Sequence, residues 1–216
     1  MGALNRHRLL LAMGAGLILL SGCDLFRPAT PEPPSGSAII PSYSSPSSTL
    51  QTIANAIEAK GQSNGQSVYI DAFADTTSDG AGFHAFLDPV TEARMRSLGI
   101  TIPQDWDRGL EDTFYGKFVR RPQVPSSAVY IFQWSIDQTQ GNDDSTATDA
   151  TLHREYRVLA AVSETDVGTI ARGFVTLSFV KVSASRWAVR RWQDREAPDA
   201  DREKGEVSMG ERRVEP

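Results

Sequence analysis

Residues 169–194, TIARGFVTLSFVKVSASRWAVRRWQD, have the clearest structural pattern in the sequence. Apolar and polar side chains alternate along residues 169–182 and again along residues 186–194, which is the period of a half-buried β-strand. A tight turn at residues 183–185 separates the two runs. The stretch therefore predicts a long antiparallel hairpin with one apolar face.

The same alternation occurs upstream of this hairpin. Residues 128–136 alternate large apolar side chains with smaller or polar ones, and residues 152–162 predict another strand. The polar segment between them, residues 138–150, predicts a loop. The second half of the chain is thus expected to form a long antiparallel sheet.

The first half of the chain has helical spacing instead. Residues 50–57 place apolar side chains on one helix face, and Ser48 or Thr49 can cap this helix. Shorter elements are expected to follow: helices at 68–74, at 91–98 and after Asp105, and a strand at 83–87. Helices followed by antiparallel strands predict an α+β domain over residues 50–194.

The N-terminus has the pattern of a secretion signal. Arg6 and Arg8 precede a 12-residue apolar run at 9–20, which is too short to span a bilayer but has the length of a signal-peptide core. The run ends in the tetrapeptide LSGC, which resembles the bacterial lipobox. We therefore expect residues 1–22 to be removed as a signal peptide and Cys23 to carry the lipid.

Two segments are expected to lie outside the folded domain. Residues 24–49 contain six prolines and seven serines, so residues 23–49 are predicted to be a lipidated, flexible tether. Residues 195–216 are mostly charged and lack apolar periodicity. They are predicted to be a disordered tail.

The order of elements and two short motifs carry a family resemblance. The sequence FAD at residues 73–75 after the opening helices, and WAVRRWQD at residues 187–194, resemble the nuclear transport factor 2-like (SnoaL-like) superfamily. The resemblance implies a strongly bent sheet that wraps around N-terminal helices to form a cone with a pocket. Alternative folds are a cystatin-like α+β layer and a lipocalin-like barrel, and the helical first half argues against the barrel.

The resemblance also implies candidate residues for acid–base chemistry. Some superfamily members are isomerases or dehydratases with Asp, His or Tyr inside the cone, which here suggests Asp71, Tyr69, His84 and Tyr130. Helical spacing places Asp71 toward solvent, and no Asp–His pair can be assigned to one face. We therefore assign no catalytic residue from the sequence.

Other motifs have simpler interpretations. Residues 61–65 match the G-x-S-x-G pattern of hydrolases, but they follow a helix rather than a strand, so they predict a link between helices. His84 and His153 lack a third ligand at suitable spacing, and Cys23 is the single cysteine, so no metal or cofactor is expected. Arg190 and Arg191 could bind an acidic partner or stack on an indole.

The net charge of the chain argues against one class of binding partner. Removal of Arg6 and Arg8 with the signal changes the formal net charge from −5 to −7. An acidic chain without a basic stripe is not expected to bind nucleic acid.

The sequence thus predicts a membrane-anchored envelope lipoprotein that faces the periplasm or the exterior. It is expected to be non-enzymatic and to bind a protein partner or a small apolar ligand through a cone-like domain. The alternatives are an enzyme of the isomerase or dehydratase type and a structural module that forms a homodimer through its sheet.

Overall fold

The computed structural model describes residues 38–215. The predicted signal peptide, Cys23 and the first part of the tether lie outside these described residues. Within residues 38–215, no helix is both long enough and apolar enough to cross a membrane.

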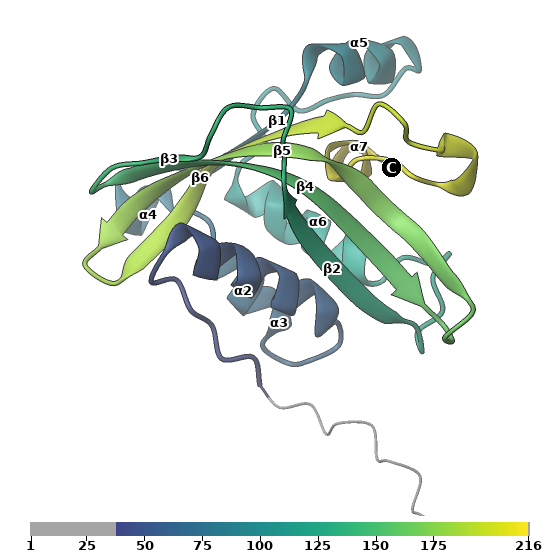
Figure 1. Cartoon of the computed structure of the whole chain (residues 1–216), viewed down its shortest axis with the longest axis horizontal. Coiled ribbons are helices and arrows are strands. Elements are labelled where there is room, and N and C mark those ends of the chain that lie inside the picture. Colours follow the sequence, from purple (N-terminus) through teal and green to yellow (C-terminus); the bar gives the residue numbers. More distant parts are fainter. Residues whose placement is uncertain (1–37, 216) are drawn as a thin grey trace, which may run out of the picture. The chain divides into compact units, whose positions relative to one another are not determined.

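A curved, open sheet forms the second half of the domain, as predicted (Figure 1). Its strand order is β1-β6-β5-β4-β2, and the short β3 pairs with β4. β1 runs parallel to β6, and the other pairs are antiparallel. The strands are β1 (His84–Leu87), β2 (Val129–Ile136), β3 (Asp144–Ser145), β4 (Asp149–Ala161), β5 (Val167–Ser183) and β6 (Arg186–Glu196).

Helices occupy the first half and the C-terminus. Figure 1 shows the sheet curving over α2, α3 and α6, with α5 on another side of the sheet. The structure therefore confirms an α+β fold in which helices pack within a bent sheet. The helices are α2 (Pro46–Glu58), α3 (Gly65–Asp71), α4 (Thr76–Asp79), α5 (Pro89–Ser97), α6 (Arg108–Val119), the 3-10 turn η2 (Arg202–Lys204) and α7 (Met209–Val214).

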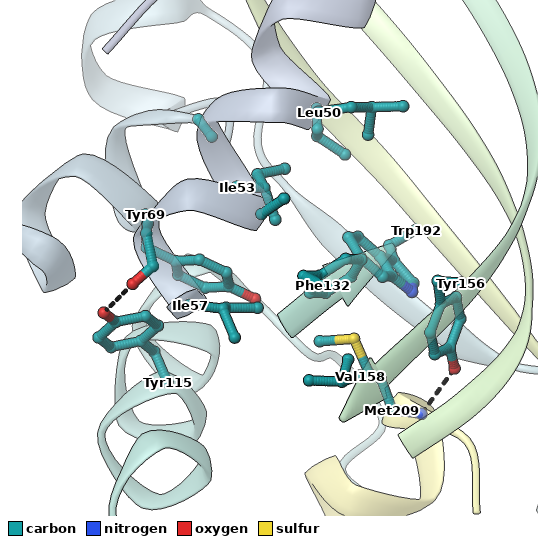
Figure 2. Packing of buried hydrophobic residues seen from close by; sticks show 14 of the residues in the cluster. Leu50, Ile53, Ile57, Tyr69, Tyr115, Phe132, Tyr156, Val158, Trp192 and Met209 are labelled. Carbon is teal, nitrogen blue, oxygen red and sulfur yellow. Dashed lines mark hydrogen bonds between the residues drawn. The ribbon is translucent and has the colours of Figure 1, made fainter. Parts of the chain in front are cut away.

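The core lies between α2 and the concave face of the sheet. Ile53 and Ile57 of α2 are fully buried and face the sheet, where Phe132 and Trp192 lie (Figure 2). The hydroxyl of Tyr156 accepts a 2.6 Å hydrogen bond from the backbone N–H of Met209, which joins β4 to α7 (Figure 2). Because these side chains fill the concave side, the interior of the cone is a packed core.

The folded domain begins earlier than residue 50. Ser45 caps α2 in a capping box with Ser48, and Pro46 starts the helix. Tyr43 is tied to the domain on both sides, because its hydroxyl donates to the carbonyl of Val68 at 2.8 Å and its carbonyl accepts from the N–H of Trp187 at 2.7 Å. The prediction of a solvated tether is therefore wrong for residues 38–49.

Two helix boundaries also differ from the prediction. α3 ends at Asp71, and Phe73 instead forms a parallel bridge with Val189 of β6. Asp107 caps α6 by accepting from the N–H of Leu110, so Asp105 is free for another role. In both places the backbone hydrogen bonds to the sheet or to a closer cap decide where the helix ends.

The predicted loop at 138–150 is shorter than expected. It contains β3, whose Asp144 pairs with Thr151, and β4 already begins at Asp149. The sequence of β3 shows no alternation of apolar and polar side chains, because both of its residues are exposed.

The prediction of a disordered tail is wrong for residues 195–215. β6 continues to Glu196, and α7 packs against the domain with Met209 fully buried. Ser208 and Glu211 form a capping box at the start of α7. Ion pairs and helix caps hold this segment against the domain. It can therefore fold without the apolar periodicity on which the prediction relied.

Candidate functional site

Five ionisable side chains meet in the interior, next to α7. They are Tyr69 of α3, Glu111 of α6, Tyr156 of β4, Asp194 of β6 and Arg213 of α7. This interior cluster draws on five separate elements.

Glu111 and Arg213 form the centre of the interior cluster. The Nε and Nη2 atoms of Arg213 donate to the two carboxylate oxygens of Glu111, each at 2.8 Å. The hydroxyl of Tyr69 and the indole N–H of Trp106 donate to the same oxygens at 2.7 and 2.8 Å. The side chains of Arg213 and Glu111 are only 3% and 0% exposed, so this is a fully desolvated, bidentate ion pair.

Asp194 forms the second half of the interior cluster. It accepts hydrogen bonds from the Tyr156 hydroxyl at 2.8 Å and from the Trp192 indole N–H at 2.9 Å. Arg213 reaches it more loosely, with Nη1 at 3.5 Å, and the guanidinium lies 4.7 Å from the centroid of the Trp192 ring. One arginine therefore links two buried carboxylates and also stacks on an aromatic ring.

Burial shifts the pKa values of these groups. Desolvation raises the pKa of Asp194 to about 6, although the charge of Arg213 and the hydrogen bonds from Trp192 and Tyr156 act in the opposite direction. Burial also raises the pKa values of Tyr69 and Tyr156 well above the usual range, with further increases from the nearby carboxylates. Both tyrosines therefore stay protonated and act as hydrogen-bond donors at neutral pH.

Arg213 stays charged for a related reason. Burial by itself would lower the pKa of Arg213, but Glu111 and the other acidic groups around the guanidinium together outweigh this effect and the pKa rises. The charged form of the guanidinium is thus favoured in a place where an isolated charge would be strongly disfavoured.

The interior cluster is enclosed by α7. A Cβ atom added at Gly210 would collide with Leu87 and lie 2.9 Å from the Cβ of Asp194, so only glycine permits this approach of the helix. The carboxylate oxygens already accept hydrogen bonds from protein groups. In this arrangement the cluster joins elements together and leaves no carboxylate facing a substrate.

The residues that the sequence suggested for acid–base chemistry lie in different parts of the domain. Tyr69 belongs to the interior cluster, but Asp71 lies at the exposed end of α3 and pairs with Arg108 at 3.2 Å. Tyr130 is buried elsewhere in the core, where its hydroxyl donates to the carbonyl of Phe118 at 3.3 Å. The structure therefore does not combine these three residues into one site.

His84 lies at the start of β1 and forms an Asp–His pair that the sequence did not reveal. Its Nδ1 atom is 2.5 Å from a carboxylate oxygen of Asp105, and the two side chains are 43% and 65% exposed. His84 borders an open hollow of about 440 Å³, which is also lined by Ala81, Gly82, Phe86, Ser178, Arg190 and Arg191.

His153 and the G-x-S-x-G segment have other roles. His153 shares a 3.1 Å hydrogen bond with Thr176 of the neighbouring strand, and the residues that the structure describes contain no cluster of three or more metal-ligating side chains. Residues 61–65 link α2 to α3, as predicted, and Ser63 is exposed there. They border a second cleft, of about 480 Å³, together with Lys60, Tyr115 and Arg120.

Sequence reasoning missed Glu111, Asp194 and Arg213. Glu111 did carry a signal, because it is a charged residue on the same helix face as Phe114 and Phe118. Asp194 was included only as the end of a strand motif, and Arg213 lies in a segment that was read as disordered.

No protein-family model matches this chain. No curated protein matches its sequence either. Similar solved structures include a protein of unknown function from Mycobacterium tuberculosis, with a TM-score of 0.48, 10% identity, and coverage of 78% of this chain and 83% of its own.

Two further solved structures have related descriptions. A nuclear transport factor 2-like protein of unknown function from Pseudomonas putida has a TM-score of 0.44 and 12% identity, over 74% of this chain and 87% of its own. A protein from Novosphingobium aromaticivorans, for which scytalone dehydratase activity has been suggested, has a TM-score of 0.44 and 12% identity, over 68% of this chain and 78% of its own. The α+β fold described above rests on the strands and helices of this chain itself.

Replacement of Arg213 tests whether the buried ion pair is essential for stability. Arg213→Met leaves the Glu111 carboxylate buried without its cation, and we expect the free energy of unfolding to fall by about 3–5 kcal/mol. Urea denaturation followed by tryptophan fluorescence measures this loss. The matched control is Arg96→Met, which breaks the exposed pair with Glu92 and should cost no more than about 0.5 kcal/mol. Equal losses in both variants would show that the buried pair has no special role.

The raised pKa of Asp194 predicts a pH-dependent difference between the wild type and Asp194→Asn. Because burial raises the pKa from 3.8 to about 6, the folded state holds the proton more tightly than the unfolded state. The contribution of Asp194 to stability is therefore greatest below pH 4 and declines as the pH rises through 6. Asparagine does not titrate, so the variant should gain about 2–3 kcal/mol relative to the wild type between pH 4 and pH 7. Urea curves at several pH values measure this gain, and a constant difference would contradict it.

Proposed function

We propose that this protein is a lipid-anchored envelope protein of bacteria whose α+β domain acts by binding rather than by catalysis. The observation that carries the proposal is the closed interior cluster, in which Glu111 and Asp194 are held by Arg213 and covered by α7. A general acid or base must reach its substrate, and these carboxylates are both 0% exposed.

The anchor is proposed from the sequence. The lipobox-like LSGC ends at Cys23, behind a signal-peptide core of suitable length. Each buried methylene contributes about 0.8 kcal/mol to membrane binding, so a cysteine with two or more acyl chains would be stably anchored.

The tether under this proposal is shorter than the sequence alone predicts, because the folded domain begins before residue 50. Residues 24–37 then connect the lipidated cysteine to the described domain. At about 3.5 Å per residue, they can span at most roughly 50 Å. A domain on a tether of this length would meet its partner or ligand close to the membrane surface.

Two of the open hollows on the described surface are candidate binding surfaces. One is the cleft beside residues 61–65, and the other is the hollow beside His84. The hollow beside His84 is lined largely by polar and charged side chains, so it suits a polar ligand better than the small apolar ligand that the sequence predicted.

An enzyme remains the second candidate, and the pair of His84 and Asp105 favours it. A carboxylate that holds Nδ1 of a histidine leaves Nε2 to exchange protons with a substrate. This pair lies on an exposed part of the sheet and not in the interior of the cone. Such an enzyme would lose turnover in the variant His84→Gln while its substrate affinity was retained.

Replacement of the cysteine tests the anchor. Cys23→Ala removes the only thiol in the chain, and we expect the protein to lose its lipid and to leave the detergent phase in phase-partitioning experiments. The wild-type chain should partition into detergent. A variant that stays in the detergent phase after signal cleavage would disprove lipidation at this residue.

Native mass spectrometry of the full chain, released from membranes in mild detergent, tests binding against the alternatives. We expect a reproducible adduct, either a small molecule or a protein, whose mass identifies its class. A dimer without any adduct would favour the structural module, for which the edge strand β2 offers a surface. A bare monomer under all conditions would contradict the binding function.

A further inference from the structure

The hollow beside His84 exists because β6 contains a β-bulge. Ser178 of β5 pairs with Arg191, but the next residue, Phe179, pairs with Val189. Arg190 is therefore an extra residue without a partner in β5. In a regular strand Arg190 and Arg191 would point to opposite faces, whereas here both are exposed and the flanking Val189 and Trp192 are buried.

The bulge places both arginines beside other polar groups. His84 of β1 is in register with Arg191, and Ser178 faces Arg191 from the other side. His84, Arg191 and Ser178 thus form a row across three neighbouring strands, with Arg190 next to it. Together they line the open hollow of about 440 Å³.

The charges in the hollow are only loosely neutralised. Within residues 38–215, Arg191 has no carboxylate at ion-pair distance, and its guanidinium lies 4.6 Å from the centroid of the Phe86 ring. Arg190 has one loose pair, with Asp149 at 3.7 Å, in which both side chains are about half exposed. An exposed pair of this kind contributes little, so a ligand can replace it.

His84 adds a further polar atom to the hollow. Asp105 occupies Nδ1, which orients the imidazole ring. The Nε2 atom lies on the side of Gly82, where an added Cβ would be 3.4 Å away. Glycine at this position therefore leaves space next to Nε2.

We propose that this hollow is an oxyanion site that binds the phosphoryl group of a phosphomonoester. The inference rests on the proposed binding function and names the chemical class of its ligand. Arginine forks match phosphoryl oxygens bidentately. Ser178 Oγ can donate a third hydrogen bond, and His84 Nε2 can donate when the ring is protonated or accept from a ligand hydroxyl when it is neutral.

A phosphoryl group fits better than a carboxylate for two reasons. A phosphomonoester carries up to two negative charges and three terminal oxygens, so it can engage both guanidinium groups at once. A carboxylate has two oxygens and one charge, which a single arginine fork satisfies. The chain as a whole is acidic, so two loosely paired arginines in one hollow form a local positive site that attracts an anion.

Isothermal titration of the full chain in neutral detergent, with inorganic phosphate at pH 7 and constant ionic strength, tests the site. We expect saturable binding with a Kd of roughly 1 mM or tighter. The double variant Arg190→Gln/Arg191→Gln should weaken binding at least tenfold. The control Arg96→Gln changes an exposed arginine on α5 and should bind phosphate like the wild type.

Other titrations define the ligand class and its source. Acetate should bind at least tenfold more weakly than phosphate, and equal affinities would overturn the phosphoryl assignment. Phosphatidic acid, whose headgroup is a phosphomonoester, will compete with phosphate when added to the micelles if the natural source is a lipid headgroup, and will not compete if the source is soluble. No saturable phosphate binding, or equal binding by the double variant, would overturn the site.

Failure of this site is distinguishable from failure of the proposed function. If phosphate does not bind but native mass spectrometry still finds an adduct, the domain binds its ligand elsewhere. If neither experiment detects binding, the binding function itself is wrong.

Discussion

A buried ion pair between Glu111 and Arg213 connects elements from distant parts of the chain. It joins α6 to α7, and through Tyr69, Trp106 and Asp194 it extends to α3 and to the sheet. Desolvation of two charges costs several kcal/mol each, and the cost is offset only where geometry is good and the remaining hydrogen-bonding capacity is used. The bidentate fork and the two neutral donors on Glu111 meet this condition. α7 can therefore close the interior although its sequence has little apolar periodicity.

Because the interior is closed, the polar and charged groups that a ligand can reach lie on the outside of the domain. The pocket that the family resemblance implies is filled by packed side chains and by the interior cluster. The groups with open access instead lie on the rim and on the outer face, where the bulge in β6 turns Arg190 and Arg191 in the same direction. The domain thus has a rigid interior that holds the strands in register and a polar outer surface that can bind without rearrangement of the core.

Much of the fold was predictable because it depends on local patterns. Alternation predicted the hairpin of β5 and β6, and helical spacing predicted α2 and α6. The site was not predictable in the same way. Asp105 was expected to cap a helix, but Asp107 does so and Asp105 pairs with His84, 21 residues earlier in the chain. The bulge at Arg190 depends on the register with β5, which the β6 sequence alone does not encode.

The α+β class, the order of its main elements and the lipobox-like segment that ends at Cys23 can be recognised from the amino-acid sequence alone. Residues within one turn of a helix or one step of a strand determine these features, so their spacing is visible in the chain. Three features become visible only in three dimensions: residues 195–215 fold, Arg213 contacts Glu111 across 102 residues, and two arginines share one hollow. Each of these depends on contacts between distant segments, and a charged residue becomes a buried partner only when another element supplies the opposite charge.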